Sequence, residues 1–505
     1  MTQETNDTAR ELEIKFLLPD THEDRLPGLP VFDGIATRTQ AQVTTYFDTS
    51  GRDLFGAGMA LRVRRIGRQR IQTLKTGSDG TAFGRGEWEA GIAGDRPEMA
   101  PLAGTPAAGL LPAGAVLEPV FTTEVRRTRG EVAMPEGARI EVALDIGEIR
   151  AGEATEAIRE LELELKAGTP AALCRLAAEI QLAIPGARLS VESKAERGWL
   201  LSTGARRVAR KADDVRLSPE MTTAEAMRDI LASTLRHLMG NEPVARAGVM
   251  EGVHQMRVAL RRTRAALRLF EPLLEPHATA RFEAELKRLG QVLGHARDWD
   301  VFCEETLAEA VKDEAGTDWI TLLRPLAEEC RAEAHARMIA ELQGPALGAL
   351  VLGLVGWAEE PALLGGEVMA QPVSEHGADL LARLNRKVRR RGKRIAGRSE
   401  EELHALRKAL KRLRYGLEFL GGLCPEKPLR KYLNGCKDLQ EHLGGLNDAV
   451  TAIAMGERLA GKGGSEVAPA LAALTQWAEA RRDAAIAQLP GDWKRFKRLP
   501  LPLPG

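Results

Sequence analysis

The sequence contains few cysteines and few aromatic residues. The cysteines are odd in number and form no CxxC pair: Cys174, Cys303, Cys330, Cys424 and Cys436. We therefore expect neither a disulfide framework nor a zinc site, and a reducing, cytoplasmic location. Aromatic residues make up 4% of the chain, which disfavours a protein that stacks single-stranded nucleic acid on aromatic platforms. The polar, acidic N-terminus is not a secretory signal.

Other absences narrow the chemistry. The longest uncharged stretch, residues 342–358, includes a proline and four glycines. It is shorter than the ~20 apolar residues of a membrane-spanning helix, so we predict a buried helix and no membrane partner. Residues 1–200 contain a single histidine, His22, and no serine, cysteine or histidine constellation for nucleophilic catalysis. The chain also lacks a GxxxxGK[ST] phosphate-binding loop.

The length and a change of pattern along the chain predict two domains. At 505 residues, more than one hydrophobic core is expected. Residues 11 to about 200 alternate like strands, with one helix expected near 170–184, and helical spacing begins near 221. We predict an α+β multidomain protein with an antiparallel β tunnel or barrel at 1–202, a linker at 203–220, an all-α duplicated helical bundle at 221–490 and a disordered proline-rich tail at 491–505.

Charged and apolar residues alternate along the predicted strands. ELEIK at 11–15, LRVR at 61–64 and ELELELK at 160–166 are examples. Successive residues of a strand point to opposite faces, so each strand has one charged face. A sandwich with solvated, salt-bridged faces explains any one strand. The whole set, with both signs mixed, favours a tunnel with a charged lumen that suits a polyanion and divalent metals.

Carboxylates form the candidate metal site. Glu11 and Glu13 share a strand face about 7 Å apart, and oxygen ligands at that spacing can share hard divalent cations. A second ladder, to which Glu141 can add, consists of Glu160, Glu162, Glu164 and Asp145. Crowded carboxylates repel one another unless metals or cations lie between them. A metal-bound water beside a carboxylate is the candidate nucleophile.

Cations on other strands form the candidate phosphate site. Arginine binds phosphate through a rigid fork, and lysine supplies a point charge. The candidates are Arg62, Arg64, Lys75, Arg85, Lys194 and either Arg127 or Arg129. Phosphoryl transfer needs oriented phosphates, charge neutralisation and an in-line water more than covalent help from the protein.

Eight motifs over residues 8–200 resemble the CYTH, or triphosphate tunnel metalloenzyme, family. In order they are ELEIKF, TTYFDT, ALRVRR, QTLKT, GRGEWEA, VALDIGEI, ELELELKAG and SKAERGW. The resemblance implies a closed tunnel that binds triphosphates with Mg²⁺ or Mn²⁺. It implies metal binding by Glu11, Glu13, Glu162 and Glu164, and phosphate binding by Lys15, Arg62, Arg64, Lys75 and Lys194. Within TTEVRRTR we favour Arg127. We assign catalytic roles to Glu11, Glu13, Lys15 and Lys75.

The helical half contains an internal repeat at a constant offset of 150 residues. VHQMRVALRRTRAALRLF at 253–270 aligns without a gap with LHALRKALKRLRYGLEFL at 403–420. The same offset relates Leu293, Gly294 and Asp298 to Leu443, Gly444 and Asp448. We infer a duplicated unit and a pseudo-twofold bundle.

Each copy of the repeated helix has an apolar stripe and a basic stripe. The basic stripes contain His254, Arg257, Arg261, Arg264 and Arg268 in one copy, and His404, Arg407, Lys408, Lys411 and Arg414 in the other. A third basic run extends from Arg383 to Arg394. Solvated faces paired with Glu283 and Glu285 are the ordinary explanation for one helix, whereas two copies that keep the same cations favour an anion site.

These stripes are similar to those of the CHAD domain over about residues 218–490, which implies binding of inorganic polyphosphate. The polyphosphate-binding residues are then His254, Arg257, Arg261, Arg264, His404, Arg407, Lys411 and Arg414. The expected function is an inorganic triphosphatase that hydrolyses tripolyphosphate, located in the cytoplasm and at polyphosphate granules, with no specific nucleic acid partner. The alternatives are a class IV-type adenylate cyclase, a nucleoside or thiamine triphosphatase, and a non-catalytic polyphosphate-binding protein.

Overall fold

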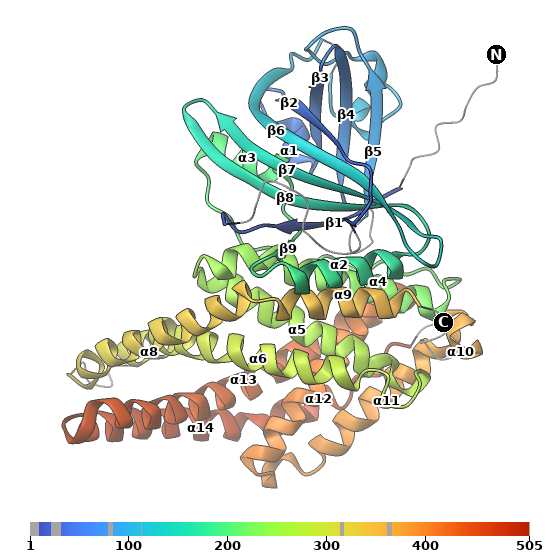
Figure 1. Ribbon diagram of the computed structural model, residues 1–505. Helices are drawn as coiled ribbons and strands as arrows, with labels where there is room; N and C mark the ends of the chain where they lie inside the picture. Colours follow the sequence, from blue (N-terminus) through green and yellow to red (C-terminus); the bar gives the residue numbers. More distant parts are fainter. Residues whose placement is uncertain are drawn as a thin grey trace. The chain divides into compact units, whose positions relative to one another are not determined.

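The computed structural model describes residues 10–21, 32–78, 84–112, 114–313, 318–360 and 366–503. The chain forms two compact units (Figure 1). The first consists of residues 1–208 and 343–360, and the second of residues 209–342 and 361–505. The sequence placed 343–360 in the helical half, whereas the structure groups this segment with the β-rich unit.

The first unit is built on a closed antiparallel sheet. Its strands are β1 (Arg10–Leu17), β2 (Arg38–Asp48), β3 (Ala60–Ile66), β4 (Gln69–Ser78), β5 (Gly84–Gly91), β6 (Glu118–Ala133), β7 (Arg139–Ala151), β8 (Ala154–Ala167) and β9 (Arg188–Ser190). They follow the order β5-β4-β3-β2-β6-β7-β8-β1-β9, and an additional pairing of β5 with β1 closes a ring of eight strands. The predicted antiparallel tunnel is confirmed.

The two faces of this sheet differ as the alternation predicts. On the outer face, Leu61, Val63 and Leu74 pack with Leu54 of α1 (Asp53–Gly56). Charged side chains at the alternate positions of the same strands point into the lumen, for example Arg62 between Leu61 and Val63. Because the period of a strand is two residues, one register places the alternate charges of a strand, such as Arg62 and Arg64, on the lumen side.

One end of the lumen is filled by α3 (Lys194–Thr203). Trp199 of this helix belongs to a buried cluster with Tyr46, Phe121, Val125, Ile149 and Ile158. Gly198 allows the close approach, because a Cβ atom there would lie 2.0 Å from the ring of Phe121. The helix therefore carries its first turn, with Lys194 and Arg197, to the floor of the lumen.

The outer face of β1 and β8 is covered by α2 (Pro170–Ala183), which confirms the helix predicted near 170–184. A second helix, α9 (Ala346–Ala358), packs on α2 (Figure 1). Gly348 lies so close to α2 that a Cβ atom would be 2.1 Å from the Gln181 side chain. The predicted buried helix is thus confirmed, and its partner is α2.

The second unit is all-α. Its helices are α4 (Thr223–Arg246), α5 (Met250–Phe270), α6 (Ala280–Val301), α7 (Leu307–Lys312), α8 (Asp318–Gln343), α10 (Glu367–Ala370), α11 (Val373–Gly392), α12 (Glu400–Phe419), α13 (Glu426–Gly463) and α14 (Ala468–Phe496). Two pairs begin 150 residues apart: α4 and α11, and α5 and α12. The duplication read from the sequence therefore extends to the helix boundaries.

The two repeats meet through a reciprocal backbone contact. Thr223 donates its N–H to the carbonyl of Gln371, and Val373 donates to the carbonyl of Met221, both at 2.8 Å. Donors and acceptors are both related by the 150-residue offset, so the two bonds exchange equivalent groups. Such an isologous contact is the mark of a twofold relationship.

The tail differs from the prediction of disorder. Residues 491–496 complete α14, and the segment beyond it packs on the second unit. Arg389 donates to the carbonyls of Lys497 at 2.7 Å and Leu499 at 2.9 Å. Proline prevents a helix here, but it leaves carbonyl groups that an arginine can hold.

No single helix among the described residues is long and apolar enough to cross a membrane. Only α8 and α9 together reach the required length and composition, and they are bent by 50° at the break between them.

Candidate functional site

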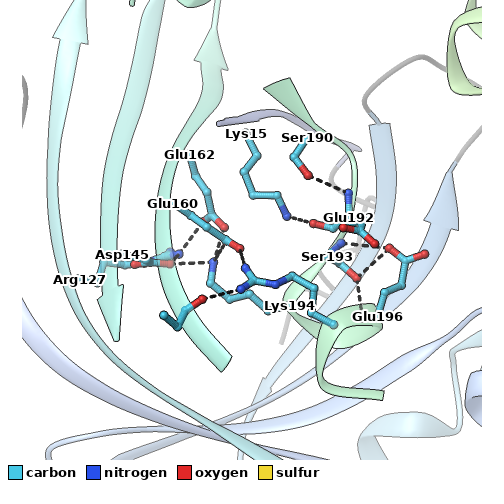
Figure 2. A network of polar contacts seen from close by, with 12 residues as sticks. Lys15, Arg127, Asp145, Glu160, Glu162, Ser190, Glu192, Ser193, Lys194 and Glu196 are labelled. Atoms are coloured by element: carbon cyan, nitrogen blue, oxygen red, sulfur yellow. Dashed lines mark hydrogen bonds and ion pairs between the residues drawn. The ribbon is translucent and has the colours of Figure 1, made fainter. Parts of the chain in front are cut away.

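Asp145, Glu160 and Glu162 lie in the lumen around one lysine. The side chain of Lys194 reaches Asp145 Oδ2 at 2.8 Å, Glu160 Oε2 at 2.6 Å and Glu162 Oε1 at 2.6 Å (Figure 2). Arg127 donates to Asp145 at 2.7 and 2.6 Å and to Glu162 at 2.5 Å. Arg127 thus lies within this buried network, whereas Arg129 is 4.0 Å from Glu141 and 41% exposed.

A third cation completes this network. Arg197 donates to Glu160 at 2.5 Å, to Glu156 at 2.6 Å and to the carbonyl of Ala157 at 2.5 Å. Sequence reasoning did not select Arg197. Its position three residues after Lys194 on one helix was the available signal, because residues at that spacing share a face.

The α3 helix starts where it does because of a capping box. Ser193 Oγ accepts a hydrogen bond from the N–H of Glu196, and the Glu196 carboxylate accepts one from the N–H of Ser193. This reciprocal pair satisfies two free donors of the first turn. It fixes Lys194 as the first helical residue and directs its side chain into the lumen.

The network keeps its members ionised although they are buried. Burial opposes the charge of Glu162, but Lys194, Arg127 and Lys15 lower its pKa well below the usual range. Burial likewise opposes the charge of Asp145, and Lys194 and Arg127 lower its pKa. For Lys194 burial acts against the charge, while Asp145, Glu160 and Glu162 raise its pKa well above the ordinary value. The predicted acids Asp145, Glu160 and Glu162 are thus neutralised by protein cations.

A separate acidic row lies across three neighbouring strands. Glu164 of β8 is the cross-strand partner of Glu13 in β1 and of Glu141 in β7. Side chains of directly opposed residues lie about 4.5–5.5 Å apart at Cβ. Glu164 accepts an ion pair from Lys166 at 2.5 Å, and the charge of Glu13 acts on Arg127.

This row is the part of the lumen that fits a divalent metal. Its donors are carboxylate oxygens, which Mg²⁺ and Mn²⁺ prefer, and the side chains of Glu141 and Glu164 are each 26% exposed. Among the described side chains, no three acidic, histidine or cysteine groups converge as a metal cluster. The predicted Glu11 and Arg85 are cross-strand partners in β1 and β5, and their side chains lie outside the described residues. His22 also lies outside them.

The opposite wall of the lumen carries the predicted phosphate-binding cations. Arg62 lies 3.4 Å and Lys75 3.3 Å from the same oxygen of Glu87. Among the described side chains, Arg64 has no ion pair with an acid, and the positive charge of Arg62, then burial and Arg127, lower its pKa to about 10. Arg64 is therefore the cation of this wall whose charge its surroundings oppose, while Glu87 partly neutralises Arg62 and Lys75.

Lys15 enters the lumen from β1. Its side chain is 6% exposed and donates to the carbonyl of Glu192. Its charge also acts on Glu160 and Glu162. Lys15, Arg127 and Lys194 are therefore brought together on one wall, and Arg62, Arg64 and Lys75 on another.

In the second unit, α5 and α12 are equivalent helices of the two repeats, and their basic stripes lie near each other. The charges of Arg257 and Arg261 act on Arg407, and those of Arg407, Arg261 and Arg414 act on Lys411. Burial, followed by these cations, lowers the pKa of Lys411 to about 7. We call Arg257, Arg261, Arg407, Lys411 and Arg414 the central cluster.

Few acids neutralise the central cluster. Arg257 donates to Asp298 at 3.0 Å and to the carbonyl of Gly294 at 2.7 Å. Arg414 pairs with Glu418 at 3.3 Å. Within the described part of the chain, Arg261 and Lys411 have no ion pair, and the Nε atoms of Arg261 and Arg407 are buried without a hydrogen-bond partner.

The remaining predicted residues lie around this cluster. His404 contacts Asn447 at 3.1 Å, and the pKa values of His404 and His254 are lowered, first by burial and then by nearby cations. Both histidines are therefore neutral at neutral pH. The alternative explanation of the basic stripes was pairing with acids. It applies to Arg268, which contacts Glu271 and Glu283. Glu285 pairs instead with Arg288.

Two family models match separate parts of the chain. The family model described as CYTH domain matches residues 9–199, and the one described as CHAD domain matches residues 229–457. An inorganic triphosphatase from Haemophilus influenzae is 31% identical over 205 residues, which cover 39% of this chain and 56% of that protein.

Comparison with solved structures found similarity to the helical half. The CHAD domain from the plant Ricinus communis covers 59% of this chain and 100% of its own, with 27% identity and a TM-score of 0.54. A Hippeastrum protein, titled a putative adenylyl cyclase with a dominant triphosphatase activity, covers 39% of this chain and 97% of its own, with 19% identity and a TM-score of 0.26.

Proposed function

Since the chain combines a CYTH domain with a CHAD domain, we propose that it is a metal-dependent inorganic triphosphatase with a polyphosphate-binding helical unit. It would hydrolyse tripolyphosphate to pyrophosphate and phosphate with Mg²⁺ or Mn²⁺. The similarity to the Haemophilus influenzae inorganic triphosphatase supports this activity. The observation that carries the proposal is the lumen itself, with cations on two walls and a row of carboxylates between strands.

The residues divide the work of the reaction. Arg62, Arg64 and Lys75 bind the phosphate chain from one wall, and Lys15 binds it from β1. Glu13 and Glu164, with Glu11, would hold the metal, which would supply charge neutralisation and make a water molecule more acidic. Water adds to the terminal phosphorus, the bridging P–O bond breaks, and pyrophosphate leaves. Lys194 and Arg127 keep Asp145, Glu160 and Glu162 ionised and the lumen rigid.

The aromatic residues of the lumen pack against one another, and this favours an inorganic substrate over a nucleotide. Tyr46 is buried, and its ring stacks on Phe121 with centroids 4.4 Å apart. Among the described lumen residues, no aromatic face is left to stack on a base, and stacking is a main source of binding energy for nucleobases. The central cluster, with buried arginine atoms that lack partners, supports polyphosphate binding by the helical unit.

The test is phosphate release from tripolyphosphate, ATP and thiamine triphosphate with Mg²⁺ or Mn²⁺. We expect metal-dependent release from tripolyphosphate above all, lost in Glu13→Gln and in Glu11→Ala, while both variants still bind long-chain polyphosphate. Release from ATP or thiamine triphosphate alone would reassign the substrate. Formation of cyclic AMP from ATP would indicate a cyclase, and no turnover of any substrate would indicate a binding protein.

A further inference from the structure

The basic run of α11 forms a second cationic cluster with α5 and α12. Arg383, Lys387 and Arg391 are spaced four residues apart on one face of α11, and residues at this spacing are neighbours. Arg383 donates to the carbonyl of Arg268 at 2.6 Å, and Arg391 to that of Ala405 at 2.5 Å. These bonds fasten the face of α11 to α5 and α12.

The side chains around this face are almost all positive. The pKa of Lys387 is lowered, first by burial and then by the positive charges of four arginines: Arg412, Arg391, Arg383 and Arg268. Burial, then Arg268, Arg264 and Arg391, lower the pKa of Arg412. We call this set the α11 cluster: Arg264, Arg268, Arg383, Lys387, Arg391 and Arg412.

Acids neutralise one edge of the α11 cluster. Glu271 and Glu283 both pair with Arg268. In the described part of the chain, Arg264, Lys387 and Arg412 make no ion pair. Half-buried cations that lack counter-ions repel one another, and a multivalent anion removes that cost.

The equivalent position in the other repeat is built differently. At the 150-residue offset, Lys387 corresponds to His237, Arg391 to Asn241, and Arg268 to Glu418. Arg412 corresponds to Arg262, which is buried and feels the charge of Glu418 and then of Asp213 and Asp214. One of the two equivalent positions is thus strongly cationic, and the other is neutral or paired.

The neutral position is also covered by the chain. Asn241 accepts from the N–H of Arg210 at 2.9 Å and donates to its carbonyl at 3.0 Å. Residues 210–214, in the segment predicted as a linker, therefore pack on the first repeat and supply the acids that face Arg262. At the 150-residue offset, the segment that corresponds to this cover is 360–364, and residues 361–364 lie outside the described part of the chain.

We propose that the α11 cluster is a second phosphate site, which binds a condensed-phosphate chain that leaves the central cluster on one side only. Arg264 belongs to the basic stripe of α5 and is next to Arg412, so it joins the two clusters. The equivalent position in the first repeat, around Asn241 and Arg262, is covered, so the phosphate chain can leave the central cluster only toward α11. The inference rests on polyphosphate binding by the helical unit, and it adds the direction and the extent of the site.

The experiment compares matched pairs of substitutions in the full chain. Lys387→Gln/Arg412→Gln removes two cations of the α11 cluster, and Arg257→Gln/Arg407→Gln removes two of the central cluster. Lys427→Gln/Arg430→Gln removes two exposed cations of α13 and changes the net charge equally. The probe is long-chain inorganic polyphosphate, titrated at several salt concentrations, with tripolyphosphate hydrolysis measured beside it.

We expect the α11 pair to weaken polyphosphate binding at least tenfold and to lower the salt dependence by about two released ions, with hydrolysis unchanged. The α13 pair should change affinity less than twofold. An α11 pair that binds like the α13 pair, while the central pair weakens binding, overturns the second site and leaves the proposed function standing. Absence of binding by the unmodified protein overturns polyphosphate binding itself.

Two further readings separate binding from folding. The α11 pair should melt no lower than the unmodified protein without ligand, because two repelling charges are removed. Lys387→Arg keeps the charge and should keep the affinity. If Lys387→Arg loses affinity as fully as the α11 pair, the charge of the cluster is not what binds the chain, and the proposal fails.

Discussion

Lys194 Nζ lies 2.6 Å from Glu160 Oε2, and the Glu160 side chain is fully buried. Asp145 is also enclosed, with 1% of its side chain exposed. Replacement of Lys194 by Met should therefore lower the free energy of unfolding by about 3–5 kcal/mol, because buried charges lose their partner. Chemical unfolding measures the change. Lys166→Met, at a 35% exposed pair with Glu164, is the control, with an expected loss below about 1 kcal/mol; an equal loss in both variants would contradict the assignment.

Acid should unfold the β-rich unit selectively. The pKa values of Asp145, Glu160 and Glu162 are lowered in the folded state by Lys194 and other cations despite burial. Their stabilising effect is complete above the ordinary carboxyl pKa near 4, and it is lost as the pH falls through the lower folded values. Unfolding followed by Trp199 fluorescence at pH 3–7 should show this loss. It should be smaller in Glu160→Gln, and a pH-independent midpoint would refute the prediction.

Lys194 sets the upper pH limit of the stability of the β-rich unit. Its pKa is raised in the folded state by three carboxylates although burial opposes the charge. Its contribution is therefore complete below the ordinary lysine pKa near 10.4 and is lost as the pH rises through the folded value. The stability of this unit should show a plateau from about pH 5 to about pH 10, which the same fluorescence titration can follow.

Arg64 should serve substrate binding rather than folding. Repulsion from Arg62 lowers its pKa to about 10, so its charge costs energy until an anion arrives. Arg64→Gln should raise the KM for tripolyphosphate about tenfold or more, while the melting temperature without substrate stays equal or rises. The exposed neighbour Arg65 points away from the lumen, and Arg65→Gln should leave KM unchanged. Equal KM in the two variants would exclude Arg64 from the phosphate site.

Polyphosphate binding should weaken as the pH rises past neutrality. Lys411 has a pKa of about 7 and faces Arg407 and Arg414 of α12, Arg261 of α5 and Asp448 of α13. Below that pH it adds a positive charge, and above it the charge is lost, so affinity at pH 8 should be roughly threefold or more below that at pH 6. Lys411→Arg should remove the difference, because arginine stays protonated. The same pH profile in both proteins would assign the effect to another group.

The packing of α9 on α2 can be tested at a single glycine. Gly348→Val would place a branched side chain against Gln181, where even a Cβ atom is 2.1 Å away. Overpacking of this kind costs about 1–3 kcal/mol. Ala349→Val, at an exposed position of the same helix, is the matched control. Urea unfolding should separate the two, and equal midpoints would show that α9 does not need this contact.

The sequence predicted what depends on a short period and missed what depends on distant contacts. Alternation placed Arg62, Arg64 and Lys15 in the lumen, because a strand has a period of two. The constant offset of 150 residues predicted the duplicated helices, because two similar stretches of sequence form similar helices. The pairing of β1 with β5 joins segments about 70 residues apart, and no local pattern encodes it.

Three misses have specific causes. The α9 segment is apolar on all sides, which indicates burial but does not name α2 as the partner. The tail cannot form a helix, yet Arg389 holds its carbonyls, so loss of helix did not mean loss of order. Arg197 was missed because a lone arginine in a motif resembles any surface arginine until Glu160 and Glu156 are seen beside it.

Residues 343–360 give the protein a particular order of assembly during its synthesis. The β-rich unit includes α9, so its cover is incomplete when residue 208 leaves the ribosome. At 5–20 residues per second, another roughly 8–30 s pass before residue 360 is made. In that interval the apolar face of α2 is without its partner, while α4 to α8 are already emerging. Nascent chains of this protein should therefore engage chaperones most strongly between these two points, and a frameshift there would release a β-rich unit that still exposes α2.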